Sequence, residues 1–136
     1  MATIPSVING VKVEFSTLVV NDVDQKIVDA LRFCIKKDIA FGHILDKIYI
    51  SSANDQHTMP SRHAQMKAVD ISRINGIKIV VGYAGSEEVK AIVEAIQRKF
   101  DRFVDRRENF GPFIKTKLGK PFSISGHKDH IHISVN

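Results

Sequence analysis

The residues best suited to chemistry are histidines near the end of the chain. Three of the six histidines, His127, His130 and His132, lie close together in the sequence. Apolar and polar residues alternate over residues 131–135, which predicts a β-strand with one buried face. Because successive side chains of a strand point to opposite faces, we expect His130, His132 and Ser134 side by side on the polar face. Two imidazoles on one surface could share a metal ion or a reacting proton.

A second segment with the same alternation carries a carboxylate. In residues 68–72, Ala-Val-Asp-Ile-Ser, the valine and isoleucine are expected on a buried face and Asp70 on the other face. His63 precedes this segment in a polar loop. Two histidines and one carboxylate supply three ligands, and a catalytic zinc site keeps its fourth position for water. The same ligands also suit iron and other first-row metals. His57 stands alone and is interpreted as an ordinary polar residue of its loop.

Turn residues and alternation predict the strands that must carry these side chains. Asn-Gly pairs at residues 9–10 and 75–76 lie between apolar segments, and such a pair is a strong signal for a β-hairpin. The second pair is expected to join strands at residues 69–74 and 77–81. Residues 48–51 predict a further short strand.

Apolar residues at helical spacing predict two helices. The first is expected to begin after the capping residues Asn21-Asp22 and to run to about Lys37, and the second follows the N-cap Ser86. The pattern over residues 101–121 is weak. This order of elements predicts a single α+β domain over residues 1–136, in which a small antiparallel sheet carries the metal site and packs against helices on one side.

The composition is that of an ordinary soluble globular protein. The 136 residues suffice for one domain, with 43% hydrophobic and 26% charged residues. No segment approaches the roughly 18 consecutive apolar residues of a membrane helix, and the N-terminus lacks the features of a secretory signal. We therefore expect a chain made in the cytoplasm, without membrane insertion. A single cysteine, Cys34, excludes an internal disulfide and is expected in the core.

The net charge of +5 favours an anionic partner. The excess of basic residues lies between residues 98 and 128. These residues are scattered, and no aromatic residues alternate with them as in a platform for single-stranded nucleic acid. A solvated basic face is therefore the simpler interpretation, and no nucleic-acid partner is expected.

Two motifs together resemble a known family. Residues 61–70, Ser-Arg-His-Ala-Gln-Met-Lys-Ala-Val-Asp, resemble the Ser-x-His-x-x-Gly-x-Ala-x-Asp signature of the D-Ala-D-Ala carboxypeptidase, lysostaphin and hedgehog group of zinc peptidases. The segment His130-Ile131-His132 resembles the His-x-His that closes the site in many members. With His127 included, the ending is similar to that of penicillin-insensitive murein endopeptidases. The resemblance covers roughly the last 90 residues, most of a typical domain.

The resemblance implies a role for each matching residue. His63, Asp70 and His132 would bind Zn²⁺, and His130 would act as the base beside the activated water. His127 would be a second proton or oxyanion partner. Candidate contacts to the substrate lie in the loop before the aspartate: Gln56, Ser61 and Arg62.

Departures from the signature bear on the reaction. Met66 stands where the signature has glycine, so the backbone there is not expected to need a conformation that only glycine can adopt. The Glu-x-x-His ending of the carboxypeptidase branch is replaced by histidines. In that branch an arginine commonly follows the strand that corresponds to the one ending here at Ser51-Ser52. A carboxypeptidase needs such a cation to bind the terminal carboxylate of its substrate, and in this chain only Arg62 is nearby.

These features predict a zinc-dependent peptidoglycan endopeptidase of the lysin type. We expect it to act as a monomer on stem peptides or cross-links of the bacterial cell wall, after release, and to be encoded by a phage or a bacterium. A D-Ala-D-Ala-type carboxypeptidase and a catalytically silent binding or structural protein of the same fold are the alternatives. A basic nucleic-acid-binding protein and an iron oxygenase are further alternatives that the motifs favour less.

Overall fold

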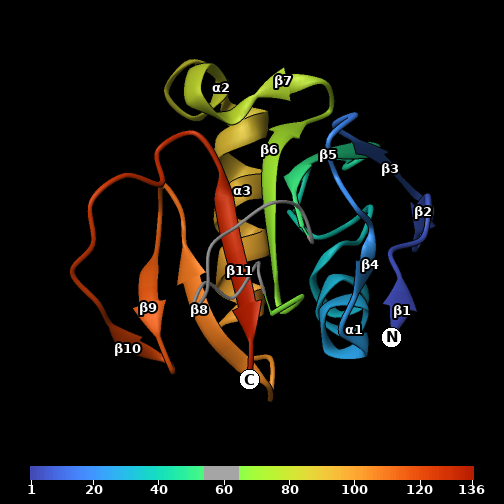
Figure 1. The fold of residues 1–136 in the computed structure, drawn as a ribbon. Helices are drawn as coiled ribbons and strands as arrows, with labels where there is room; N and C mark the ends of the chain where they lie inside the picture. Colours follow the sequence, from blue (N-terminus) through green and yellow to red (C-terminus); the bar gives the residue numbers. More distant parts are fainter. Residues whose placement is uncertain (54–64) are drawn as a thin grey trace.

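A computed structural model describes residues 1–53 and 65–136. Within them the chain forms a large mixed sheet, a small antiparallel sheet and three helices (Figure 1). The strands are β1 (Ala2–Thr3), β2 (Val7–Ile8), β3 (Val11–Phe15), β4 (Asp22–Val23), β5 (Lys47–Ser52), β6 (Ala68–Ile74), β7 (Ile77–Lys78), β8 (Arg106–Phe110), β9 (Lys115–Lys117), β10 (Lys120–Pro121) and β11 (Ile131–Val135). The helices are α1 (Gln25–Cys34), α2 (Ile79–Gly85) and α3 (Glu87–Phe100). The predicted α+β class is confirmed.

The large sheet places the C-terminal strand near its centre. Its order is β10-β9-β8-β11-β6-β5-β3-β2, and β7 pairs with β6. The sheet is larger than expected, and its β3–β5 pair is parallel. A parallel pair needs a crossover connection, and α1 lies between these two strands in the sequence. The strand β11 is antiparallel to both of its neighbours, β6 and β8.

Two helices cover the apolar face of this sheet. In Figure 1, α3 lies behind β6 and β11. Val69, Ile71, Ile131 and Ile133 are completely buried on the strands and belong to one core cluster with residues of α1 and α3. Their alternation leaves the polar residues between them on the opposite face. The helices on one side of the sheet therefore fix which face carries the candidate site.

Cys34 is a core residue, as its position in an apolar stripe predicts. It is completely buried on α1, and its thiol lies 3.1 Å from the carbonyl oxygen of Ala30. Burial raises the pKa of the Cys34 thiol to about 12. The thiolate that a nucleophilic cysteine needs is therefore disfavoured at neutral pH.

The sequence located most elements, with two corrections at helices. Both Asn-Gly hairpins and the N-cap Ser86 of α3 are present. The first helix begins later than predicted because Asp22 pairs with β1 as part of β4, so the N-cap is Asp24 and α1 begins at Gln25. It also ends at Cys34, earlier than the predicted end near Lys37. The predicted strand at residues 77–81 is also wrong, since only β7 pairs and the chain then turns into α2. A short apolar run does not distinguish a strand from a buried helix.

The region of weak pattern, residues 101–121, contains the strands β8, β9 and β10. A buried polar network attaches β8 to α3. Gln97, completely buried, donates from Nε2 to Asn109 Oδ1 at 2.9 Å and to the Ile114 carbonyl oxygen at 3.0 Å. Its Oε1 accepts from the backbone N–H groups of Phe113 at 3.0 Å and Ile114 at 3.1 Å.

Asn109 completes this network from the strand side. Its Nδ2 donates to the carbonyl oxygen of Gln97 and to Asp101 Oδ1, both at 2.8 Å. A Cβ atom at Gly111 would lie 2.6 Å from the Gln97 amide, so glycine is needed for this close approach. Polar pairing of this kind, rather than an apolar alternation, holds β8 in place.

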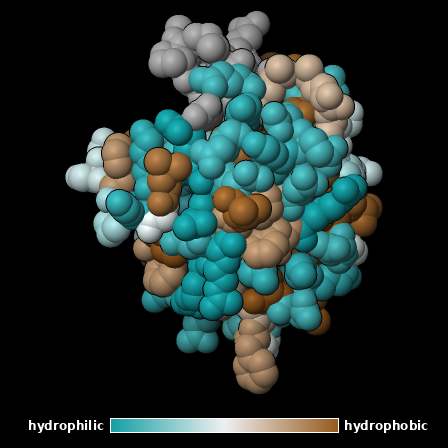
Figure 2. All heavy atoms as spheres, turned by 90° about the horizontal axis from the view of Figure 1, so that it is seen from below, coloured by the Kyte–Doolittle hydropathy of each residue, from teal (hydrophilic) through white to brown (hydrophobic). Residues whose placement is uncertain are grey.

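The outside of the molecule is mixed. Figure 2 shows a mainly hydrophilic face, with hydrophobic residues in small groups between polar ones. Among the described residues, none of the helices has both the length and the apolar character needed to cross a membrane.

We expect Gln97→Leu to lower the free energy of unfolding by about 2–4 kcal/mol, because each buried group left without its hydrogen bond costs about 1–3 kcal/mol. Urea denaturation followed by circular dichroism measures the loss. The matched control is Gln25→Leu, at an exposed glutamine of α1, which should change stability by less than about 0.5 kcal/mol. Equal effects of the two substitutions would contradict a structural role for the network.

Candidate metal centre

The pairing of β11 with β6 brings the aspartate and a C-terminal histidine together. The register of the two strands places His132 directly opposite Asp70. The atoms His132 Nδ1 and Asp70 Oδ1 are 2.9 Å apart. The strand alternation in the sequence predicts that these side chains share a face, and the structure adds that they are in contact.

A second carboxylate lies on the other side of the same imidazole. Glu108 on β8 places Oε1 3.0 Å from His132 Nε2. Ser134 donates its hydroxyl to the same Glu108 oxygen at 2.7 Å. We call Asp70, His132, Glu108 and Ser134 the carboxylate–imidazole chain. Its three ionisable side chains are little exposed, at 16% for Asp70, 12% for His132 and 18% for Glu108.

The charges in this chain depend on one another. Burial by itself lowers the pKa of His132, but the hydrogen bonds and charges of Asp70 and Glu108 outweigh it and raise that pKa to about 9. Burial by itself raises the pKa of Glu108, but the hydrogen bonds from His132 and Ser134 lower it to about 2. Without metal, the imidazole is therefore a cation between two carboxylates at neutral pH.

His130 stands beside this chain, immediately before β11. Its Nδ1 lies 2.7 Å from Asp129 Oδ1, and its Nε2 lies 3.9 Å from Asp70 Oδ1. The hydrogen bond from His130 lowers the pKa of Asp129. A carboxylate at Nδ1 favours the tautomer with its proton on that nitrogen, which leaves Nε2 as the acceptor facing Asp70.

His127 completes a group of three imidazoles. Its ring centroid is 5.0 Å from that of His130 and 5.9 Å from that of His132. Phe110 stacks on His132 with centroids 5.6 Å apart, and its centroid is 5.1 Å from that of His127. Burial lowers the pKa of His127, and the neighbouring His130 and His132 lower it further. The ring is therefore neutral at pH 7, and its Nδ1 donates to the Ser125 carbonyl oxygen at 3.2 Å.

The remaining predicted site residues lie outside the part of the chain that the structure describes. These are the third predicted ligand, His63, and the predicted substrate contacts Gln56, Ser61 and Arg62; His57 lies there too. Within residues 1–53 and 65–136 there is no group of three or more ligating side chains in a metal-binding arrangement. The structure thus brings together Asp70, His132, His130 and His127, and it leaves the third ligand as a prediction.

The donors that the structure describes fit zinc chemically. The atoms of Asp70 and His132 are 2.9 Å apart, whereas two ligands of a tetrahedral zinc ion with bonds of about 2.0–2.2 Å lie about 3.3 Å apart. If Asp70 Oδ1 and His132 Nδ1 moved slightly apart, a metal ion could take the place of the proton at Nδ1. Glu108 would then serve as an outer carboxylate, because a metal-bound histidine usually donates its other ring N–H to such a group.

Glu108, like Asp129, is a site residue that the sequence did not predict. Strand β8 has the sequence Arg-Arg-Glu-Asn-Phe, which shows neither alternation nor a motif. Its neighbour in space, β11, begins more than twenty residues later, and the two strands are joined by the register of the sheet. No local signal could have identified this carboxylate.

The backbone at Met66 takes a conformation that glycine favours but that other residues also adopt. Met66, at the glycine position, has φ +63°. The backbone there does adopt the left-handed conformation that glycine takes most easily. The turn before β6 therefore keeps the shape that a glycine would favour, although the side chain differs.

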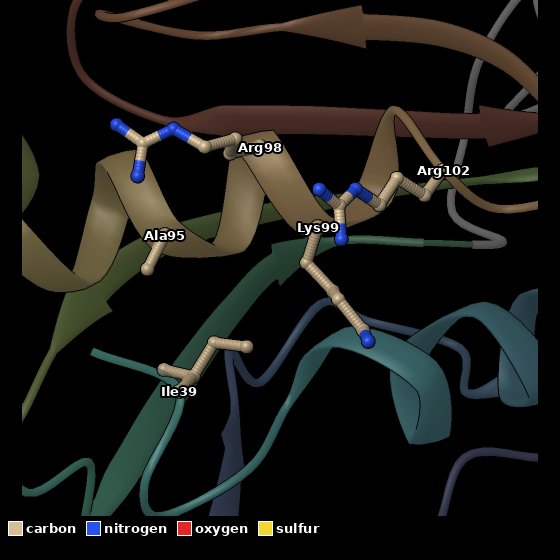
Figure 3. A pocket seen from close by; sticks show the side chains of 5 residues that line it. All are labelled: Ile39, Ala95, Arg98, Lys99 and Arg102. Carbon is tan, nitrogen blue, oxygen red and sulfur yellow. The ribbon is translucent and has the colours of Figure 1, made fainter. Parts of the chain in front are cut away.

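A separate basic surface lies on α3. Lys99 extends from α3 towards α1, while Arg98 and Arg102 stay beside α3 (Figure 3). They border a pocket of about 170 Å³ with Ile39 and Ala95. Arg98 is 3.9 Å from Glu94, and Lys99 Nζ is 4.5 Å from the centroid of the Phe33 ring. This surface belongs to the helix that covers the opposite face of the sheet from Asp70.

Comparison with protein-family models, with curated proteins and with solved structures found no match for this chain. Function is therefore inferred from the geometry of the centre and from the sequence motifs.

We expect the stability of the metal-free protein to fall as the pH rises from 7 to 10. The pKa of His132 is about 9 in the folded state and 6.5 at its ordinary value, so the folded state holds the proton more tightly. This stabilisation is complete below pH 6.5 and is lost as the pH rises through 9. Urea denaturation in the presence of a chelator measures the profile. His132→Ala should lack this part of the decline, and parallel profiles for the two proteins would contradict the assignment.

Proposed function

We propose that this chain is a zinc-dependent peptidase that acts on peptidoglycan. The observation that carries the proposal is the contact between Asp70 and His132, beside a histidine that is oriented by its own carboxylate. The resemblance to the zinc peptidase signature adds His63 as the third ligand. When bound, zinc would polarise the peptide carbonyl and make a water molecule nucleophilic at neutral pH.

His130 is the proposed base. Its Nε2 lies 3.9 Å from Asp70 Oδ1, next to the proposed metal position. Asp129 holds the proton on Nδ1, so Nε2 can accept a proton from water and return it to the leaving amine. His127 is neutral and in ring contact with His130, and with its Nδ1 donating to Ser125 it presents Nε2 as an acceptor. This favours a proton partner over an oxyanion donor for His127.

The proposed substrate class follows from the motifs and the charge. The ending with three histidines is similar to murein endopeptidases, which favours cleavage within stem peptides or cross-links over removal of a terminal residue. The net charge of +5 and the basic surface of α3 suit anionic wall polymers. The proposed site of action is the cell wall, as for a lysin.

A catalytically silent protein is the second candidate. The observation in its favour is that a protonated His132 and its two carboxylate neighbours stabilise one another's charges without a metal ion. Such a protein would keep this network as a structural element and would need no metal. Zinc binding and peptidoglycan digestion distinguish the two candidates.

We expect His132→Ala to lose both zinc and hydrolysis, because it removes a ligand. His130→Ala should retain zinc and lose most turnover, by about 10²–10⁴-fold, the usual contribution of a general acid–base group. Metal analysis of the purified proteins and digestion of purified peptidoglycan, with and without chelator, measure these effects. If neither the chelator nor the His132→Ala substitution reduces digestion, the zinc peptidase proposal is wrong. Equal loss of metal in the two variants would mean that His130 is a ligand.

We expect Glu108→Ala to weaken zinc binding by about 10–100-fold, because loss of an outer carboxylate lets the ligand imidazole reorient. Glu108→Gln keeps an acceptor for His132 Nε2 and should lose less. Competition with a chromophoric chelator measures the affinity without reference to activity. The control is Glu94→Ala, at a carboxylate of α3 that pairs with Arg98. Unchanged affinity in Glu108→Ala would contradict the positioning role.

A further inference from the structure

A pocket adjoins the candidate metal centre on the same face of the sheet. It has a volume of about 330 Å³, and its walls include Tyr49 and Ser51 of β5, Ser72 and Arg73 of β6, and Lys78 of β7. Asp129, which contacts the proposed base, also lines it. Ser72 follows Asp70 by two residues on the same strand. The pocket and the centre therefore share both β6 and the segment that precedes β11.

A β-bulge in β6 turns two consecutive residues towards this pocket. Ile50 of β5 pairs with Ile71, and Tyr49 pairs with Arg73, so Ser72 is the extra residue. Ile71 and Ile74 are completely buried on the core side. Ser72 and Arg73 are both partly exposed between them. A bulge re-aims side chains in this way, and here it directs an arginine to the polar face.

Two cations, Arg73 and Lys78, line this pocket. The register of β6 and β7 places Arg73 opposite Lys78. The Arg73 guanidinium lies 4.3 Å from the centroid of the Tyr49 ring, a favourable cation–π contact. Like charges at directly opposite positions destabilise a strand pair. Among residues 1–53 and 65–136, no carboxylate forms an ion pair with either cation, and the Asp129 carboxylate is engaged by His130.

We propose that this pocket binds a free carboxylate of the peptide substrate. The inference rests on the proposed function, because the peptide must lie across the centre for its carboxylate to reach the pocket. Arg73 offers two parallel N–H donors to a carboxylate, and Lys78 adds a point charge. The neighbouring Asp129 repels a doubly charged phosphate more than a singly charged carboxylate. The pocket thus supplies the cation for a substrate carboxylate that the sequence suggested only in Arg62.

Peptide binding tests the proposal without requiring hydrolysis. The full chain, stripped of metal so that the peptide stays intact, is titrated calorimetrically with a synthetic stem peptide. A second titration uses the same peptide with every carboxylate amidated, and a third uses inorganic phosphate. We expect the wild type to bind the free acid at least about 10-fold more tightly than the amide, as for charge-assisted hydrogen bonds, and to bind phosphate more weakly than the acid.

Substitutions in the pocket test whether it causes the preference for the free acid over the amide. Arg73→Gln should abolish it. Lys78→Gln should reduce it, at an exposed position where substitutions usually change stability little. The control Lys90→Gln removes an exposed cation of α3, on the helix side of the sheet, and should keep the full preference. Retention of the preference in both pocket variants would overturn the proposal. So would equal binding of acid and amide, or binding of neither, by the wild type.

Digestion of peptidoglycan by the zinc-loaded protein separates this inference from the proposed function. Digestion without any preference for the free acid refutes the pocket alone. A preference that depends on Arg73, in a protein that digests nothing, supports the pocket and refutes the peptidase.

Discussion

The centre depends on the antiparallel pairing that sets β11 between β6 and β8. Through this pairing, one imidazole, that of His132, contacts a carboxylate on each side. The register is held by burial, because Ile131 and Ile133 occupy the core on the other face of the same strand. A slip of one residue would turn His132 into the core and these apolar residues to the polar face. Packing of the hydrophobic core thus fixes the chemistry of the opposite face.

The little-exposed charges of Asp70 and Glu108 affect how tightly His132 holds a proton. A histidine between two carboxylates binds a proton tightly, and the same lone pair at Nδ1 is the one that a metal ion would use. If the proposed zinc binds, it would therefore compete with the proton for one position. Removing one partner of such a buried group leaves an uncompensated charge, which is costly. Asp70 and Glu108 consequently stabilise the fold and tune the site through the same contacts.

The strands on the two sides of β11 are positioned by different interactions. The network of Gln97 and Asn109 holds β8, and with it Glu108, against α3. On the other side of the centre, the bulge in β6 directs Arg73 away from the core. The strand on each side of β11 therefore carries a charged side chain of the polar face, Glu108 on β8 and Arg73 on β6. Under the proposed function, a peptide would lie across these strands with its reactive bond near His130.

The sequence by itself determined the features that depend on neighbouring residues. Strand alternation put His132 and Asp70 on polar faces, and turn and capping residues located the hairpins and the start of α3. The partnership of Glu108 with His132 and the outward turn of Arg73 came only from the tertiary structure. The physical reason is that side-chain direction along one strand follows from the pleat of the backbone, whereas the choice and register of distant strands follow from how the whole core is buried.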